Sequence, residues 1–377
     1  MSMSERLDSF QRRHKALGFP LGVLYKFFDD QGNYLAALMT YYAFIALIPL
    51  LLLASSILGF ILHGSPGLQQ DILDSALAQF PVVHDLLNQE GGPRGSTWAA
   101  IIGALGALYG AMGVAQATQN AMNIAWAVPR NKRPNPFTGR LRSLGLLITA
   151  GIGILATTWV STLGSDIDAL NTNITPWLKI ALLALTITVN AMIFTLLFRL
   201  ATTHEHSLLL AIPGAFVTST LWQVLQYGGA FYVTQVIQHA SRANQYFAGF
   251  LGLIGYLYLG SLCVILGVEV NVVKAHRLYP RALLTPFTDN VNLTDADRRA
   301  YADYAAAQRT KDFAHVDVRF EYDGQYRSAR RRAAAERAAR EAADQRLKEH
   351  NELTEARKRK EARARTGEEP PTGSMNP

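Results

Sequence analysis

The sequence predicts an all-α, polytopic membrane protein, in which a six-transmembrane-helix bundle is followed by a cytoplasmic tail that is partly helical and disordered at its end. A transmembrane helix needs about 20 mostly apolar residues. The 377-residue chain has six runs of about that length or longer without Asp, Glu, Lys or Arg, namely 34–62, 96–128, 143–165, 180–198, 207–241 and 243–268. The charged residues, 17% of the total, lie almost entirely at the two ends and in short connections.

The basic residues predict a topology for these spans. Before the tail, eleven Lys and Arg lie in the N-terminal arm, in connection 129–142 and at Arg199, whereas the alternate connections hold only Arg94, Lys179 and Arg242. Because cytoplasmic connections carry the excess of positive charge, both termini are predicted to be cytoplasmic. The net charge of +7 then favours membrane lipids with anionic head groups as partners. We do not expect nucleic acid to be a partner.

Three segments are expected along the chain. Residues 1–33 form a cytoplasmic arm that contains an interfacial helix, residues 34–273 form the transmembrane domain, and residues 274–377 form the basic tail. An amphipathic extracytoplasmic segment is predicted at 65–90, after the first span. The predicted spans are 35–62, 97–119, 143–165, 178–199, 207–232 and 246–271.

Proline and glycine mark special positions in the spans. Pro49 lacks a backbone donor and should kink the first span. Gly106 and Gly110 stand in GxxxG register in the second span, and the sixth span is also rich in glycine. Small residues at this spacing predict closely approaching helices. The contacts can form within one chain or between copies, so the sequence leaves the oligomeric state open.

The tail has the composition of a solvated helix. Residues 327–365 are mostly Ala, Arg, Glu and Lys and show no heptad pattern, which predicts a single exposed helix. An arm that binds anionic lipid or RNA is the alternative interpretation. Residues 367–377 are expected to be disordered.

Polar side chains form stripes inside three spans. In the second span they recur at i, i+3, i+4 and i+7, which places them on one helix face. Such groups should face the bundle interior, where they either fix packing through interhelical hydrogen bonds or line a polar cavity that admits water or a lipid head group. The candidate cavity-lining residues are Gln116, Gln119, Asn120, Asn123, Thr186, Asn190, Gln223, Gln226 and Tyr227.

Glu269 is the acidic residue that lies closest to a span interior. An ionisable group within a membrane is costly and is a functional candidate by default. Its position near the cytoplasmic end favours a structural ion pair or an interfacial anchor, with Arg142 and Arg199 on the same face of the membrane. A proton relay is the alternative.

Motifs for hydrolysis or metal binding are missing from the sequence. His204-Glu205-His206 is a histidine cluster, but a metal site needs three or four converging ligands, so a polar turn is the simpler interpretation. Walker A, GxSxG and HExxH motifs are also absent. The single cysteine, Cys263, is expected to pack as a small apolar residue. We therefore predict no catalytic residue, metal or cofactor, and no enzymatic activity.

Four segments together resemble one family. Residues 35–49, LAALMTYYAFIALIP, resemble the opening span of the YihY/BrkB family, formerly labelled ribonuclease BN. The segments 123–126 (NIAW), 213–215 (PGA) and 267–271 (GVEVN) resemble its later signatures in the same order. The residues that match these motifs are Tyr41, Tyr42, Pro49, Asn123, Trp126, Pro213, Gly214, Trp222, Gly267, Glu269 and Asn271.

The resemblance implies a six-helix protein of the bacterial inner membrane with a role in the cell envelope. We favour a transporter or lipid-handling protein, because the polar stripes offer a cavity and a hydrolytic site is missing. One alternative is a membrane-anchored ribonuclease, which the family's old label suggests and the missing site disfavours. Another is a non-transporting scaffold that recruits envelope protein partners through its tail.

Overall fold

The computed structural model describes residues 8, 10–11, 13–61, 97–169, 176–204, 207–237, 239, 242–285, 291–320, 334–350, 352 and 354. All regular elements within these residues are helical. They are α2 (Lys15–Asp29), α3 (Gly32–Ile61), α6 (Thr97–Ala125), the 3₁₀ turn η1 (Arg130–Lys132), α7 (Pro136–Ala169), α8 (Pro176–Ala201), α9 (Leu208–Tyr232), the π turn η2 (Val233–Ile237), α10 (Arg242–His276) and α11 (Asp295–Ala307). A further helix covers residues 334–350.

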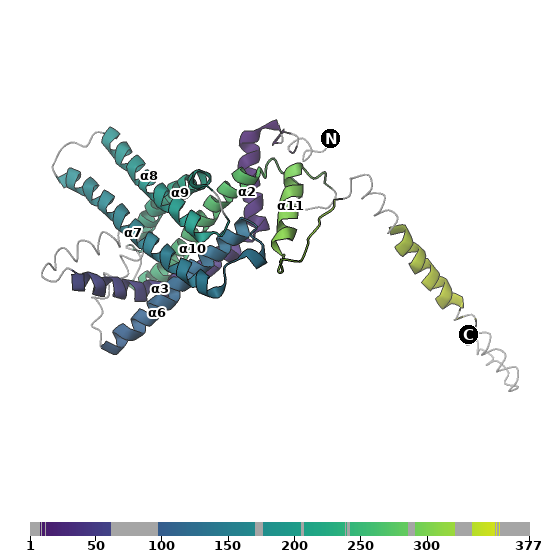
Figure 1. Ribbon diagram of the computed structural model, residues 1–377, viewed down its shortest axis with the longest axis horizontal. Coiled ribbons are helices and arrows are strands. Elements are labelled where there is room, and N and C mark those ends of the chain that lie inside the picture. Colours follow the sequence, from purple (N-terminus) through teal and green to yellow (C-terminus); the bar gives the residue numbers. More distant parts are fainter. Residues whose placement is uncertain are drawn as a thin grey trace, which may run out of the picture. The chain divides into compact units, whose positions relative to one another are not determined.

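The long helices α3, α6, α7, α8, α9 and α10 form one bundle, and α2 and α11 lie next to each other at one end of it (Figure 1). Within the described residues, four stretches are long and apolar enough to cross a membrane: Pro136–Trp159, Trp177–Ala201, Leu208–Ile237 and Phe247–His276. The other two long helices, α3 and α6, have 30 and 29 residues. The count of six spans stays a prediction, and segment 65–90 lies outside the described residues.

Small residues bring α3 and α6 into close contact, as the GxxxG pattern predicts. A Cβ atom on Gly110 would lie 2.7 Å from Cα of Ala46, and one on Gly113 would overlap the Tyr42 ring. Close backbone approach of this kind is how helices associate in lipid, where apolar burial gives little driving force. Pro49 lies inside α3, which does not end there.

A second close crossing joins α9 to α10. Gly214 and Gly267 face each other, and a Cβ atom on Gly214 would overlap the backbone oxygen of Gly267. The Asn271 amide spans the same contact, because its Oδ1 accepts from Gly214 N at 2.7 Å and its Nδ2 donates to Ala211 O at 3.1 Å. Gly214 belongs to the third sequence motif and Gly267 and Asn271 belong to the fourth, so the two motifs form one helix–helix contact.

The start of the tail at residue 274 stays a prediction. Helix α10 continues to His276, and the chain divides into the compact units Met1–Val318 and Arg319–Pro377. The residues between α10 and this division pack through polar contacts, which a hydropathy pattern does not predict. Arg281 is almost fully buried, and Thr294 and Asp297 form a capping box at the start of α11. In the second unit, the helix at 334–350 is exposed along its length.

Candidate functional site at one end of the bundle

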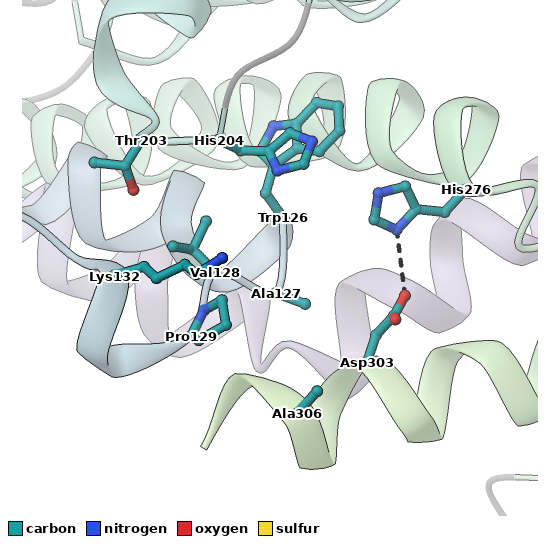
Figure 2. A pocket seen from close by; sticks show the side chains of 10 residues that line it. All are labelled: Trp126, Ala127, Val128, Pro129, Lys132, Thr203, His204, His276, Asp303 and Ala306. Carbon is teal, nitrogen blue, oxygen red and sulfur yellow. Dashed lines mark hydrogen bonds and ion pairs between the residues drawn. The ribbon is translucent and has the colours of Figure 1, made fainter. Parts of the chain in front are cut away.

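The ends of three long helices border a polar pocket that is partly open. Helix α6 ends at Ala125, α8 at Ala201 and α10 at His276, and α11 lies beside them. The pocket has a volume of about 570 Å³. Its lining residues, shown in Figure 2, are Trp126, Ala127, Val128, Pro129, Lys132, Thr203, His204, His276, Asp303 and Ala306.

Two of the helices that border this pocket end with the same backbone conformation. Ala127 follows α6 with a φ of 49°, and Arg277 follows α10 with a φ of 54°. The next amide reaches back five residues in each case, from Val128 N to Asn123 O at 2.8 Å and from Leu278 N to Val273 O at 3.0 Å. This is the Schellman arrangement, which satisfies the free carbonyl groups at a helix end.

Asn123 holds the connection between α8 and α9 against α6. Its buried Oδ1 accepts hydrogen bonds from Thr203 N at 3.0 Å and from Thr203 Oγ1 at 2.8 Å. His204 N in turn donates to Thr202 Oγ1 at 3.1 Å. Asn123 lies about one helical turn before Trp126 on the chain. Its bonds to Thr203 therefore hold the segment that carries His204 in place.

We expect Asn123→Ala to loosen this connection. The substitution removes two hydrogen bonds to the half-buried Thr203, each of which contributes about 0.5–1.5 kcal/mol. The apparent melting temperature in detergent should fall by several degrees. Gln116→Ala is the matched control, because Gln116 is exposed on the same helix and its loss should change little. Equal melting temperatures for the two variants would show that Asn123 does not hold the connection.

Aromatic rings form one wall of the pocket. Trp126 and His204 stack with ring centroids 4.7 Å apart and planes 14° apart. The His276 ring lies edge-on to both, at 5.7 Å from Trp126 and 6.2 Å from His204. Asp303 of α11 orients His276 through a contact of 3.2 Å to Nδ1, drawn as the dashed line in Figure 2. Lys132 adds a positive charge from the basic connection.

A buried charge cluster lies at the same end of the bundle. Glu269 is fully buried, and its carboxylate lies 4.0 Å from Lys26 Nζ and faces Asp30. Lys26 also pairs with Asp30 and lies 5.0 Å from the centre of the Tyr304 ring. Burial, followed by the negative charge of Asp30, raises the pKa of Tyr304 above its usual value. The hydroxyl therefore keeps its proton next to the carboxylates.

The partner of Glu269 is not the one that topology suggested. Arg142 and Arg199 are both exposed, so the expectation of a pair with either was wrong. Lys26 takes this place because α2 packs against the end of α10, a contact between segments far apart in the chain. Within the part of the chain that the structure describes, neither carboxylate oxygen of Glu269 receives a hydrogen bond.

Arg281 ties the neighbouring segments together. Its Nε donates to Asp297 Oδ1 at 2.7 Å and its Nη1 donates to Asp29 Oδ2 at 2.6 Å. Burial disfavours the guanidinium charge, but the two carboxylates outweigh it and raise the pKa of Arg281 above its usual value. Burial also raises the pKa of Asp29, against the opposing effect of Arg281. One ionic network thus joins three parts of the chain: α2 through Asp29, the segment between α10 and α11 through Arg281, and α11 through Asp297.

Inside the bundle lies a second cavity, which is apolar. It has a volume of about 350 Å³ and is lined by residues from all six long helices, with few polar groups among them. The residues that line it are Met39, Val114, Ala115, Thr118, Met122, Leu146, Leu147, Ala150, Gly153, Ile154, Thr157, Asn190, Ile193, Phe194, Leu197, Phe198, Trp222 and Val264.

Of the nine predicted stripe residues, one lines this cavity and eight lie elsewhere. Asn190 lines it, and its Oδ1 accepts a hydrogen bond from Thr157 at 2.9 Å. Gln119 donates to Ser143 Oγ at 2.8 Å, which links α6 to α7. Gln116 and Tyr227 are exposed on the outside of the bundle.

The remaining predicted residues are partly buried. Asn120 accepts a hydrogen bond from Arg133 at 3.2 Å, and the Thr186 hydroxyl donates to Leu182 O of its own helix at 2.9 Å. Gln223 and Gln226 are partly buried on α9. The observed bonds of Gln119 and Asn123 agree with the packing interpretation of the stripes.

Sequence reasoning missed most of the polar pocket. His276 and Asp303 are far from His204 in sequence, and no spacing rule connects them. His204 was interpreted as part of a polar turn, although it stacks on a motif tryptophan. Trp126, which belongs to the second family motif, was the residue in the sequence that could have indicated this pocket. Within the described residues, no group of three His, Cys, Asp or Glu could hold a metal ion.

Comparison with known proteins places the chain in a family. Residues 23–289, more than half of the chain, match the family Virulence factor BrkB. The chain belongs to the BrkB family. It is 24% identical over 252 residues to "Inner membrane protein YhjD" of Escherichia coli (strain K12), which covers 62% of this chain and 74% of that protein. No solved structure matches the chain.

The family match covers the part of the site that lies before residue 290. It includes Trp126, His204 and His276 of the polar pocket, the charge cluster around Glu269, and every residue that lines the apolar cavity. Helix α11, which supplies Asp303, lies beyond the matched residues.

Proposed function

We propose that this BrkB-family protein is a multi-pass inner-membrane protein that binds lipid inside its helix bundle and handles or transports it within the cell envelope. The observation that carries this proposal is the apolar cavity between the six long helices. The inner-membrane location is supported by the similarity to "Inner membrane protein YhjD" and by the apolar helices. The basic connections favour a topology with both termini in the cytoplasm.

The cavity has the size and chemistry of a ligand site. Ligand pockets in proteins are mostly apolar, with a few polar groups, and have volumes of about 300–1,000 Å³. An acyl chain satisfies this lining better than a polar solute does, because unpaired polar groups are costly in an apolar setting. The polar cavity expected from the stripes is therefore replaced in this proposal by an apolar one, with Thr118, Thr157 and Asn190 as its polar residues.

Filling the cavity tests the proposal. Ala150 lines it, and Ala150→Phe should exclude an acyl chain. A photoreactive fatty acyl phospholipid, incorporated in nanodiscs, should crosslink to Met122, Trp222 and their neighbours in the wild type. We expect the variant to lose most of this labelling, as read by mass spectrometry of peptides.

Gly151 provides the matched control. It is the next residue on α7 and is exposed, and no atom lies within 4 Å of the position that a Cβ atom would take there. Gly151→Phe should therefore leave labelling inside the bundle unchanged. If both variants label like the wild type, or if labelling occurs only on the outer surface, the cavity does not hold lipid and the proposed function fails.

A further inference from the structure

We propose that the polar pocket binds the phosphate group of an amphiphile whose chain occupies the apolar cavity. The pocket is the one formed by Lys132, His204, His276, Trp126 and Asp303. This inference rests on the proposed function and adds to it the chemical class of the ligand.

The residues of the pocket lie at the ends of candidate spans, and lipid phosphates lie at the level where a span leaves the hydrocarbon core. The span Trp177–Ala201 ends three residues before His204, the span Phe247–His276 ends at His276 itself, and Lys132 lies four residues before the span that starts at Pro136. Tryptophan is enriched at this interface, where its ring meets the head groups. Trp126 fits this position.

The pocket and the cavity are adjacent along α6. Met122 lines the apolar cavity, and Trp126 lines the polar pocket. Residues four apart lie on one helix face, about one turn from each other. On α8, Phe198 lines the cavity shortly before Thr203 and His204 reach the pocket. The two sites therefore lie about one helical turn apart along α6, and the proposed ligand would place its charged head in one and its apolar chain in the other.

The side chains of the pocket match an anion. Lys132 supplies a permanent positive charge, and the two imidazoles supply ring nitrogens that donate when protonated. Asp303 engages Nδ1 of His276, so Nε2 is the nitrogen that is left for a ligand. The stacked Trp126 ring supports His204 from one side, as Figure 2 shows. A phosphate group, with several acceptor oxygens, suits three donors from three different segments.

A binding experiment on the full-length purified protein tests this assignment. We would titrate phosphatidate, diacylglycerol with the same chains, and glycerol 3-phosphate, and measure bound ligand by native mass spectrometry. Phosphatidate should bind more tightly than diacylglycerol. In Lys132→Gln and in His276→Gln this preference should fall about tenfold or more, because hydrogen bonds to charged groups contribute at least about one factor of ten.

Arg140→Gln is the matched control for general attraction of anions to the basic connection. Arg140 is exposed and does not line the pocket, so phosphatidate preference should survive its loss. Equal losses in Arg140→Gln and Lys132→Gln, or a preference unchanged in both pocket variants, would overturn the assignment.

The remaining outcomes separate the source of the phosphate from the proposed function. If glycerol 3-phosphate alone binds with the same dependence on Lys132 and His276, the phosphate site stands and its ligand is a soluble ester. If acyl labelling inside the cavity persists while the pocket variants bind phosphatidate normally, the phosphate assignment fails and lipid binding stands. If Ala150→Phe has no effect on labelling, the proposed function fails whatever the pocket binds.

Discussion

Arg281→Met should destabilise the protein strongly, and more than Asn123→Ala does. The guanidinium is almost completely buried between Asp29 and Asp297, and Asp297 also accepts hydrogen bonds from Ala282 N at 3.0 Å and Thr294 N at 2.9 Å. Removing one partner of a buried ion pair costs about 3–5 kcal/mol, because the other charge stays buried without compensation. The apparent melting temperature should fall steeply, and limited proteolysis should begin between α10 and α11.

Two further variants test the cause of this loss. Asp29→Asn in the Arg281→Met background removes one uncompensated carboxylate and should recover part of the stability, which a double-mutant cycle measures. Lys274→Met removes an exposed charge at the end of α10 and should change little, since surface charges contribute little. An Arg281→Met variant as stable as Lys274→Met would show that the network does not hold these segments together.

Gly267→Ala should have the second largest effect. A Cβ atom at Gly267 would overlap Thr218 Oγ1 and lie 2.8 Å from Gly214 O. Helices α9 and α10 would have to separate, which breaks the Asn271 bonds to Gly214 N and Ala211 O. Overpacking of this kind costs about 1–3 kcal/mol or more, and the apparent melting temperature should fall accordingly.

The control for this substitution lies on the same helix. Gly255 is exposed and has no atom within 4 Å of a Cβ position. Gly255→Ala should be neutral or slightly stabilising, because alanine favours a helix by about 1 kcal/mol over glycine. A loss of stability in both variants would point to backbone flexibility of α10 rather than to the crossing with α9.

The sequence predicted the helical class and the close-packing faces well, because both depend on local pattern. Uncharged runs located the four spans that the structure supports, and the glycines at 110 and 267 stand at helix crossings. Hydropathy did not predict which residues after 273 pack against the helices, because these residues are polar and their burial depends on partners such as Asp29, which lies in α2.

The sequence alone therefore determined that this is an all-helical membrane protein of the BrkB type, and which residues allow its helices to approach each other. Length, hydropathy and residue size are properties of one segment at a time. Tertiary structure decided which groups meet: Lys26 with Glu269, Arg281 with Asp297, and His204 with Trp126 and His276. The physical reason is that a buried charge or a stacked ring interacts with the groups that lie nearest in space. In this fold those groups come from helix ends that are far apart in the sequence, and residue spacing does not predict which ends meet.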